Sequence, residues 1–151
     1  MKKAIIVILI AIVAVSSAFA FEFVSVGIET GRGFLASVDM EIVDNLDIYG
    51  RFGYTGYVDF SFGGQYKVAE LKIASTVFDV KPGAQFGFDF GDDYFGFSLL
   101  GTCQFAFETG HFQAFLRPGL GMYAVSIKYG NNRYSDTDFA FVIETGVAYL
   151  F

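Results

Sequence analysis

Residues Phe139–Phe151 read FAFVIETGVAYLF and predict a β-strand with two different faces. The odd positions are mostly bulky and apolar, whereas the even positions are mostly small and include one carboxylate, Glu144. Alternate side chains of a strand point to opposite faces of a sheet. We therefore expect one apolar face and one small, polar face, in a strand that ends on an aromatic residue, Phe151.

Residues 1–20 have the three parts of a secretory signal peptide. Lys2 and Lys3 form a basic start, residues 4–15 form an apolar run, and Ala18-Phe19-Ala20 is a small-x-small cleavage site. That apolar run is short against the roughly 20 residues that a transmembrane helix needs. The sequence therefore predicts cleavage after Ala20 and a single mature domain over residues 21–151.

The composition of this expected mature domain argues for an exported all-β protein. Without Lys2 and Lys3, 8 of the 10 basic residues remain against 16 acidic ones, so nucleic-acid phosphates would be repelled. The 18 glycines all follow residue 20, and glycine disfavours helices. The aromatic residues and the lack of a long helical period indicate strands instead. Cys103 is the only cysteine, which excludes an internal disulfide.

Turn signals divide the mature domain into eight expected strands. An eight-stranded barrel needs about 10 residues per strand, roughly 80 in all, and the domain is long enough for these strands and their connections. Glycine, proline, asparagine and aspartate mark the turns. The expected strands are 22–30, 34–43, 46–60, 66–80, 84–90, 94–108, 111–129 and the closing strand at 139–151. We also expect a β-bulge between Pro118 and Ala124, because the polarity of the two faces changes there.

The alternating pattern fits two architectures. A soluble barrel turns its apolar face inward, whereas a membrane barrel turns it outward to lipid. Two features favour the second: the charged face carries many glycines, which suit a narrow interior, and the apolar content is 54%. With the export signal, they predict an all-β, eight-stranded, antiparallel up-and-down transmembrane barrel.

The whole chain resembles the small eight-stranded outer-membrane barrels of the OmpA and OmpX type. The resemblance rests on the signal peptide, the alternating strands and the ending Val147-Ala148-Tyr149-Leu150-Phe151. It implies that Tyr149 and Phe151 act as an assembly signal and that the protein lies in the outer membrane of a two-membraned bacterium. The implied partners are membrane lipid, periplasmic chaperones and the barrel-assembly machinery, with no nucleic acid, and the implied state is a monomer.

The resemblance also implies an orientation, with the short turns in the periplasm. The expected periplasmic turns are Asp44-Asn45, Lys81-Pro82-Gly83 and Thr109-Gly110. The expected external loops are at Arg32, Gly63-Gly64, Asp92-Asp93 and Asn131 to Asp136.

Charged residues on the polar parity are the candidate functional residues. We expect an internal charge network that includes Arg51, Lys72, Asp89, Arg117 and Glu144. Arg117 and Glu144 fall on neighbouring strands at similar depth. Unpaired charge in a narrow interior is costly, which favours a network that fills the lumen. The alternative is a narrow cation-preferring channel, because acidic residues outnumber basic ones.

A lipid-modifying enzyme is the third hypothesis. Some barrels that modify lipid A resemble His-Ser-acid hydrolases, but the only histidine, His111, falls in an expected periplasmic turn. Cys103 falls on the lipid-facing parity, where we expect an inert side chain. No metal-ligand or cofactor pattern stands out. The sequence therefore predicts a non-enzymatic barrel, without cofactor or metal, that has a structural or surface role in the cell envelope.

Overall fold

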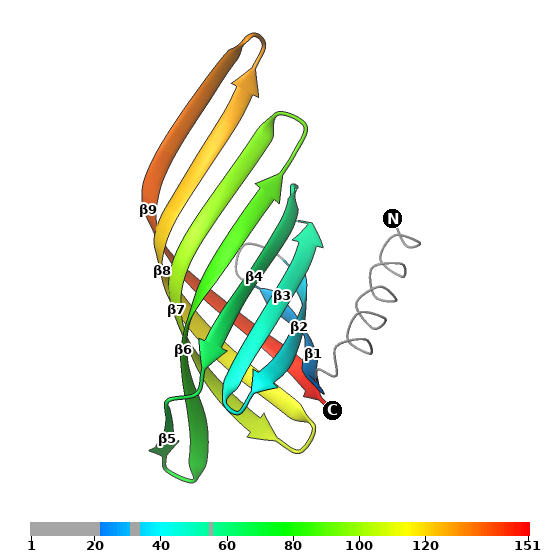
Figure 1. The fold of residues 1–151 in the computed structure, drawn as a ribbon, viewed down its shortest axis with the longest axis vertical. Helices are drawn as coiled ribbons and strands as arrows, with labels where there is room; N and C mark the ends of the chain where they lie inside the picture. The colour runs from blue at the N-terminus through cyan, green and yellow to red at the C-terminus, as the bar shows by residue number, and fades with distance from the viewer. Residues whose placement is uncertain (1–21, 31–33, 55) are drawn as a thin grey trace.

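The computed structural model describes residues 22–30, 34–54 and 56–151, and the described chain is built from β-strands (Figure 1). The expected signal peptide, residues 1–20, lies outside the described residues. The strands are β1 (Glu22–Thr30), β2 (Phe34–Val43), β3 (Leu46–Tyr54), β4 (Val58–Tyr66), β5 (Ala69–Ile73), β6 (Thr76–Phe90), β7 (Tyr94–Thr109), β8 (Phe112–Tyr129) and β9 (Asn132–Leu150). In the same residues, no helix is long and apolar enough to cross a membrane.

Eight of the described strands close into a ring. Neighbours pair antiparallel in the order β4-β3-β2-β1-β9-β8-β7-β6, and β4 also pairs with β6. The first and last strands meet along six residue pairs, from Ser25 opposite Leu150 to Thr30 opposite Thr145. The expectation of an all-β, eight-stranded, antiparallel up-and-down barrel is therefore confirmed.

The strand bounds agree with the sequence at the start of the chain and differ in its middle. β1 and β2 have the expected bounds. The expected strand 46–60 is instead divided, because β3 ends at Tyr54 and β4 begins at Val58. Gly63-Gly64 lies inside β4, and Lys81-Pro82-Gly83 lies inside β6, so neither is a turn. The expected strand 66–80 is instead a hairpin, formed by β5 and the start of β6.

Pro82 is tolerated inside β6 because it faces a gap in the pairing. The amide of Val68 donates to the carbonyl of Val80, so the backbone of residue 80 points toward β5. Pro82, two residues later, points the same way. The pairing of β5 with β6 ends at Val80, and the pairing of β4 with β6 begins at Gly83. A missing N–H at Pro82 therefore costs no ladder bond.

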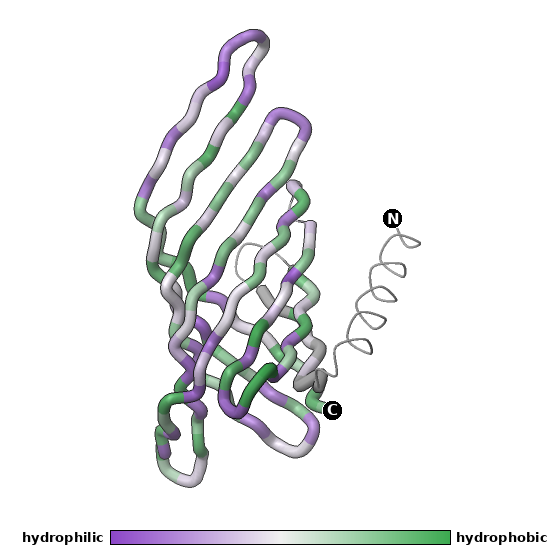
Figure 2. Tube along the Cα trace, in the orientation of Figure 1, coloured by the Kyte–Doolittle hydropathy of each residue, from purple (hydrophilic) through white to green (hydrophobic). Residues whose placement is uncertain are grey.

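The expected bulge in β8 is absent, and the expected loop at 131–136 is mostly strand. The pairing of β8 with β9 runs from Phe112 opposite Tyr149 to Tyr129 opposite Asn132 without a shift. The faces of β8 change polarity because the β8–β9 hairpin rises beyond the other turns (Figure 1). Both of its faces are then exposed, and Figure 2 shows a hydrophilic tip.

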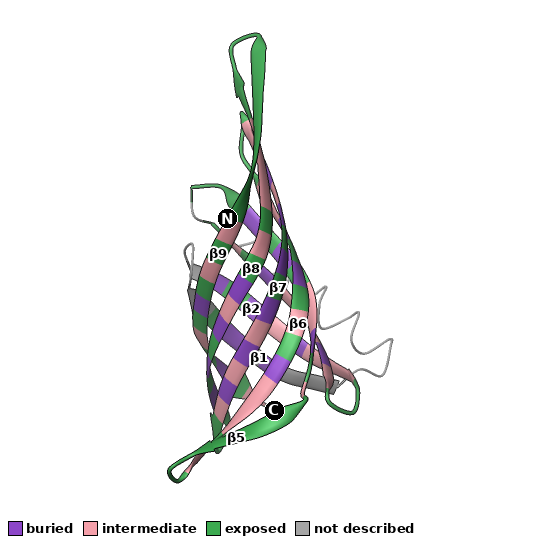
Figure 3. Cartoon of the chain, turned by 90° about the vertical axis from the view of Figure 1, so that its left-hand side faces the viewer, coloured by how far each residue is buried: buried purple, intermediate pink, exposed green. Residues whose placement is uncertain are grey.

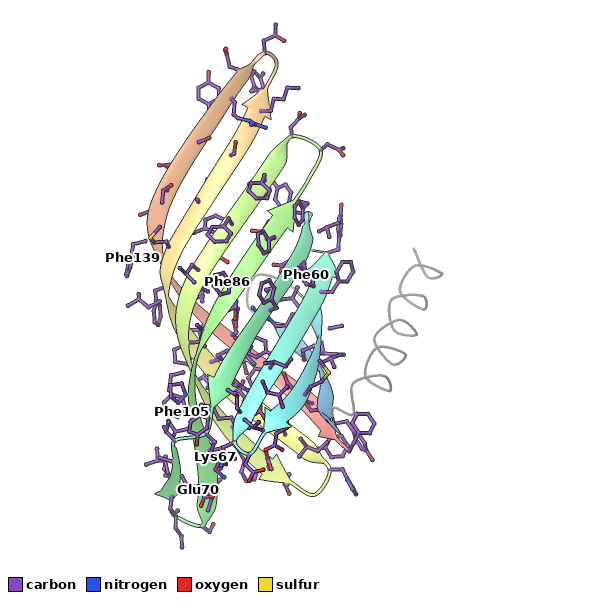
Figure 4. All side chains as sticks on the ribbon, in the orientation of Figure 1. Phe60, Lys67, Glu70, Phe86, Phe105 and Phe139 are labelled. Atoms are coloured by element: carbon purple, nitrogen blue, oxygen red, sulfur yellow. The ribbon has the colours of Figure 1, made fainter. Side chains whose placement is uncertain are left out.

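The barrel is polar inside and apolar outside. Among the described buried side chains, sixteen are polar or charged and six are hydrophobic. Buried and exposed positions alternate along the strands of the ring (Figure 3). Large apolar side chains lie exposed on the outside, and Figure 4 shows Phe139 projecting away from the barrel. The structure therefore has the inverted polarity that the sequence predicts, and not that of a soluble barrel.

Glycines on the inner face make room for aromatic rings. A Cβ atom at Gly63 would lie 2.6 Å from the Cζ atom of Tyr49, and one at Gly146 would lie 2.6 Å from the Cζ atom of Phe115. Tyr49 and Phe115 are both buried. The small residues on this face are thus explained by a narrow, filled interior.

Candidate functional site

One buried carboxylate joins two guanidinium groups inside the barrel. The Oε2 atom of Glu144, on β9, lies 2.7 Å from Nη1 of Arg51 on β3 and 3.5 Å from Nη1 of Arg117 on β8. Arg117 and Glu144 are directly opposite each other in the β8–β9 pairing. The structure therefore brings together three of the five residues that the sequence assigned to a charge network.

Arg117 also contacts an amide and two aromatic rings. Its side chain is 0% exposed, and Nε donates a hydrogen bond of 2.9 Å to Oε1 of Gln104. Its Cζ atom lies 4.3 Å from the ring centroid of Tyr49 and 4.8 Å from that of Phe115. A guanidinium between aromatic faces gains cation–π attraction and loses its water. Arg117 is therefore held in one position and is not a mobile charge.

The same network crosses the lumen through neutral side chains. The hydroxyl of Tyr49 donates to Oε1 of Gln85 at 3.1 Å, and Nε2 of Gln85 donates to Oε1 of Glu144 at 3.4 Å. We call this set the lumen network; it consists of Tyr49, Arg51, Gln85, Gln104, Arg117 and Glu144. In the ring order, β3 and β8 lie on opposite sides of the barrel. The contacts of β3 side chains with Arg117 and Glu144 thus span the full width of the interior.

A second buried ion pair lies nearer the end of the barrel that carries the C-terminus. Nζ of Lys81, on β6, donates to Oδ2 of Asp47, on β3, at 2.8 Å, and both side chains are buried. Lys81 was expected in a turn, so its inward position was missed. The adjacent Pro82-Gly83 resembles a turn, although it lies inside a strand. The alternation of that strand places Lys81 on the inner face with Gln85.

Asp89 lies at the other end of the barrel, away from the contacts of the lumen network. Its Oδ2 atom accepts a hydrogen bond of 2.9 Å from the hydroxyl of Tyr123, and that hydroxyl also contacts the hydroxyl of Tyr94. The ring of Tyr94 stacks on that of Tyr57, with centroids 4.0 Å apart. Asp89 is therefore part of a tyrosine cluster at the end of the barrel that carries the β8–β9 hairpin.

Lys72 is not in the lumen, which corrects the prediction. It keeps the polar parity, but β5 pairs only with β6 and stands outside the closed ring, so the side chain is exposed. The same holds for Glu70. The nearby Lys67 makes ion pairs of 2.8 Å with both Glu70 and Asp79 (Figure 4). These contacts hold the β5–β6 hairpin to the end of the barrel.

The remaining candidate residues of the sequence lie on the surface. His111 is exposed in the β7–β8 turn, and its ring stacks on that of Tyr149 at 5.6 Å. Tyr149 also meets Phe151 edge to face at 5.5 Å, and both are exposed. Cys103 is a free, half-buried thiol. Within the described ranges, no group of three or more histidine, cysteine, aspartate or glutamate side chains could hold a metal ion.

Sequence reasoning missed the neutral members of the lumen network. Tyr49, Gln85 and Gln104 carry no charge, so a search for charged residues on the inner parity passes over them. Their signal is the alternation itself, since each falls on the face of its strand that carries the buried positions. Polar residues of any kind on that face are the better criterion.

The apolar exterior has the height of a membrane. Along β9, the outward positions run from Phe139 to Tyr149 and are apolar except for Thr145. Ten residue steps of about 3.3 Å, tilted by about 40°, give a height of about 25 Å. Beyond Phe139 the outward positions become Thr137, Ser135 and Arg133. About 25 Å is also the height of the apolar band of outer-membrane barrels.

Comparisons with known proteins identify no family. No protein-family profile matches the chain, and no curated protein matches it. Among solved structures it is similar to a chain described as "KdgM porin in complex with disordered oligogalacturonate". The two are 11% identical, with a TM-score of 0.29, over 86% of this chain and 99% of the other. A likeness this weak carries no argument about function.

Proposed function

We propose that this protein is a non-enzymatic integral β-barrel of the bacterial outer membrane with a structural or surface role in the envelope. The observation that carries the proposal is the inverted polarity of the barrel. Exposed side chains such as Phe139, Phe141 and Ile143 are each more than half exposed. Burial of such a side chain stabilises a protein by about 1.5–3 kcal/mol, which lipid would supply here and water would not.

Placement in the outer membrane rests on the architecture together with the expected signal peptide. Bacterial outer-membrane barrels have an even number of antiparallel strands, an apolar band and a polar interior. The resemblance to barrels of the OmpA and OmpX type gives the proposed orientation. The end with Asp44-Asn45 and the C-terminus then faces the periplasm, and the β8–β9 hairpin faces outward.

The lumen network favours a closed interior over a channel. Arg51, Glu144 and Arg117 bridge opposite walls, and their bulk fills the space that an ion would cross. The cation-channel hypothesis is therefore the weaker one.

The test of the proposal is the gel mobility of the protein in isolated outer membranes. A folded barrel that resists detergent should migrate differently before and after boiling. We expect the protein in the outer-membrane fraction with such a shift. A soluble location, or identical mobility of heated and unheated samples, would contradict the proposal.

A further inference from the structure

A small pocket lies on the outside of the barrel, beside the β8–β9 hairpin. Its volume is about 230 Å³, smaller than the roughly 300–1,000 Å³ of sites for drug-sized ligands. It can hold one group about the size of a sugar ring. Its lining includes two phenylalanines, two aspartates and two cations, which are Phe90, Phe95, Asp92, Asp93, Lys128 and Arg133; Gly91, Tyr94 and Ser126 complete it.

The two phenylalanines are the upper end of the apolar exterior. Phe90 and Phe95 are directly opposite each other, their rings lie 5.6 Å apart, and both are exposed. Phe90 continues the outward-facing row of Phe86 and Phe88 on β6. The pocket therefore begins where the proposed lipid-facing surface ends.

The two cations stand next to this boundary on the same outer face. Lys128 and Arg133 are directly opposite each other in the β8–β9 hairpin. The amide of Lys128 donates to the carbonyl of Asp93 at 2.8 Å, which fixes the hairpin against the β6–β7 turn. Among the described residues, neither Lys128 nor Arg133 has an ion-pair partner. Two cations without partners at the edge of an apolar surface suit the phosphate of a lipid headgroup.

Two carboxylates, Asp92 and Asp93, line the same pocket. Asp92 and Asp93 would repel a bare phosphate, but carboxylates accept hydrogen bonds from sugar hydroxyls. We propose that this pocket binds the phosphorylated sugar headgroup of an outer-leaflet glycolipid, with phosphate on Lys128 and Arg133 and hydroxyls on Asp92 and Asp93. The apolar base of the headgroup lies on Phe90 and Phe95. This site rests on the proposed membrane location and adds a specific lipid partner to it.

The test is native mass spectrometry of the detergent-purified mature protein, titrated with four probes. These probes are lipid A carrying both phosphates, dephosphorylated lipid A, phosphatidylglycerol and inorganic phosphate. We expect lipid A to bind most tightly, and K128Q/R133Q to lose about a hundredfold, or tenfold per cation. K72Q is the matched control, because Lys72 is an exposed cation at the opposite end of the barrel, and it should bind like the native protein.

Three outcomes would overturn the site. They are equal lipid A binding by K128Q/R133Q, equal binding of phosphatidylglycerol, and equal binding of inorganic phosphate without lipid. The same preparations are run unheated and boiled on a gel. A native protein with the mobility shift but without the expected lipid preference contradicts the glycolipid site alone. The absence of the shift contradicts the membrane proposal.

Discussion

Arg51 and Glu144 form an ion pair across the inside of the barrel, with 2.7 Å between Nη1 and Oε2. Two strands, β2 and β1, separate their own strands, β3 and β9, in the ring. Two side chains can meet between these strands only if the interior is no wider than the two side chains together. The ion pair therefore constrains the width of the barrel and also obstructs its lumen.

Loss of the shared carboxylate should destabilise the barrel strongly. Glu144→Gln removes the carboxylate that contacts both Arg51 and Arg117, and breaking a buried ion pair costs about 3–5 kcal/mol. Urea unfolding of the detergent-solubilised barrel, followed by far-ultraviolet circular dichroism, measures the change. The control is Glu70→Gln, which removes an exposed carboxylate and should cost less than about 1 kcal/mol. Equal effects of the two variants would show that the lumen network is not a stabilising unit.

The intact network should block ion flow. Because the contacts of Arg51, Glu144 and Arg117 span opposite walls, native protein in planar bilayers should give no current steps. The double variant Arg51→Ala/Arg117→Ala removes both long side chains and should produce steps, whereas Lys72→Ala, outside the ring, should stay silent. Regular steps from the native protein would instead support the cation-channel hypothesis.

The glycines under the inward rings should not tolerate larger residues. A Cβ at Gly146 would meet the ring of Phe115 and the carbonyl of Ile28, at 2.6 and 2.8 Å. Gly146→Val should therefore destabilise the barrel by about 1–3 kcal/mol through overpacking, as measured by the urea midpoint. Gly101→Val is the control, since Gly101 is exposed and its nearest neighbour would be 3.7 Å away. If both variants unfold at the same midpoint, the filled interior is refuted.

The β5–β6 hairpin should respond to alkaline pH through Lys67. Hydrogen bonds to Asp79 and then Glu70 raise the pKa of Lys67 above its usual value of about 10.4. A raised pKa means that the ion pairs stabilise the hairpin fully below about pH 10.4 and are lost as pH rises through the higher folded value. Nitrogen-15 resonances of the Lys67 ammonium should titrate at higher pH in the native protein than in Asp79→Asn. The same titration in both proteins would exclude this contact as the cause.

Alternation of side chains predicted the fold because most of each strand in the ring follows it. β1 and β2 have the expected bounds, and Arg117 meets Glu144 as expected, because both facts depend only on strand parity and neighbouring strands. The strand bounds in the middle of the chain were predicted wrongly because glycine and proline occur inside strands here as well as in turns. Gly63 leaves room for the ring of Tyr49, and Pro82 faces a gap in the strand pairing. In the sequence, each of them resembles a turn signal.

Contacts between distant strands could not be predicted from the sequence. Arg51 reaches Glu144 only because the eight-stranded barrel is narrow enough for their side chains to meet across it. The positions of the charged residues in the sequence do not give the width of the barrel. Lys72 has the parity of a lumen residue, and its exposure follows from β5 leaving the ring, which is a property of the pairing partners. The inward position of Lys81 was not predicted because a turn was expected at residues 81–83.

We propose above that the apolar exterior of this barrel faces lipid. The direct measurement is the accessibility of spin labels in reconstituted protein, with Cys103 replaced by serine and single cysteines at Phe141, Ile143, Val147 and Ser135. The first three positions are exposed on the apolar band, and Ser135 lies on the hairpin beyond it. Labels on the band should collide with dissolved oxygen and be shielded from a water-soluble nickel complex, with the reverse at Ser135. Strong nickel access at Phe141, Ile143 and Val147 would contradict the account.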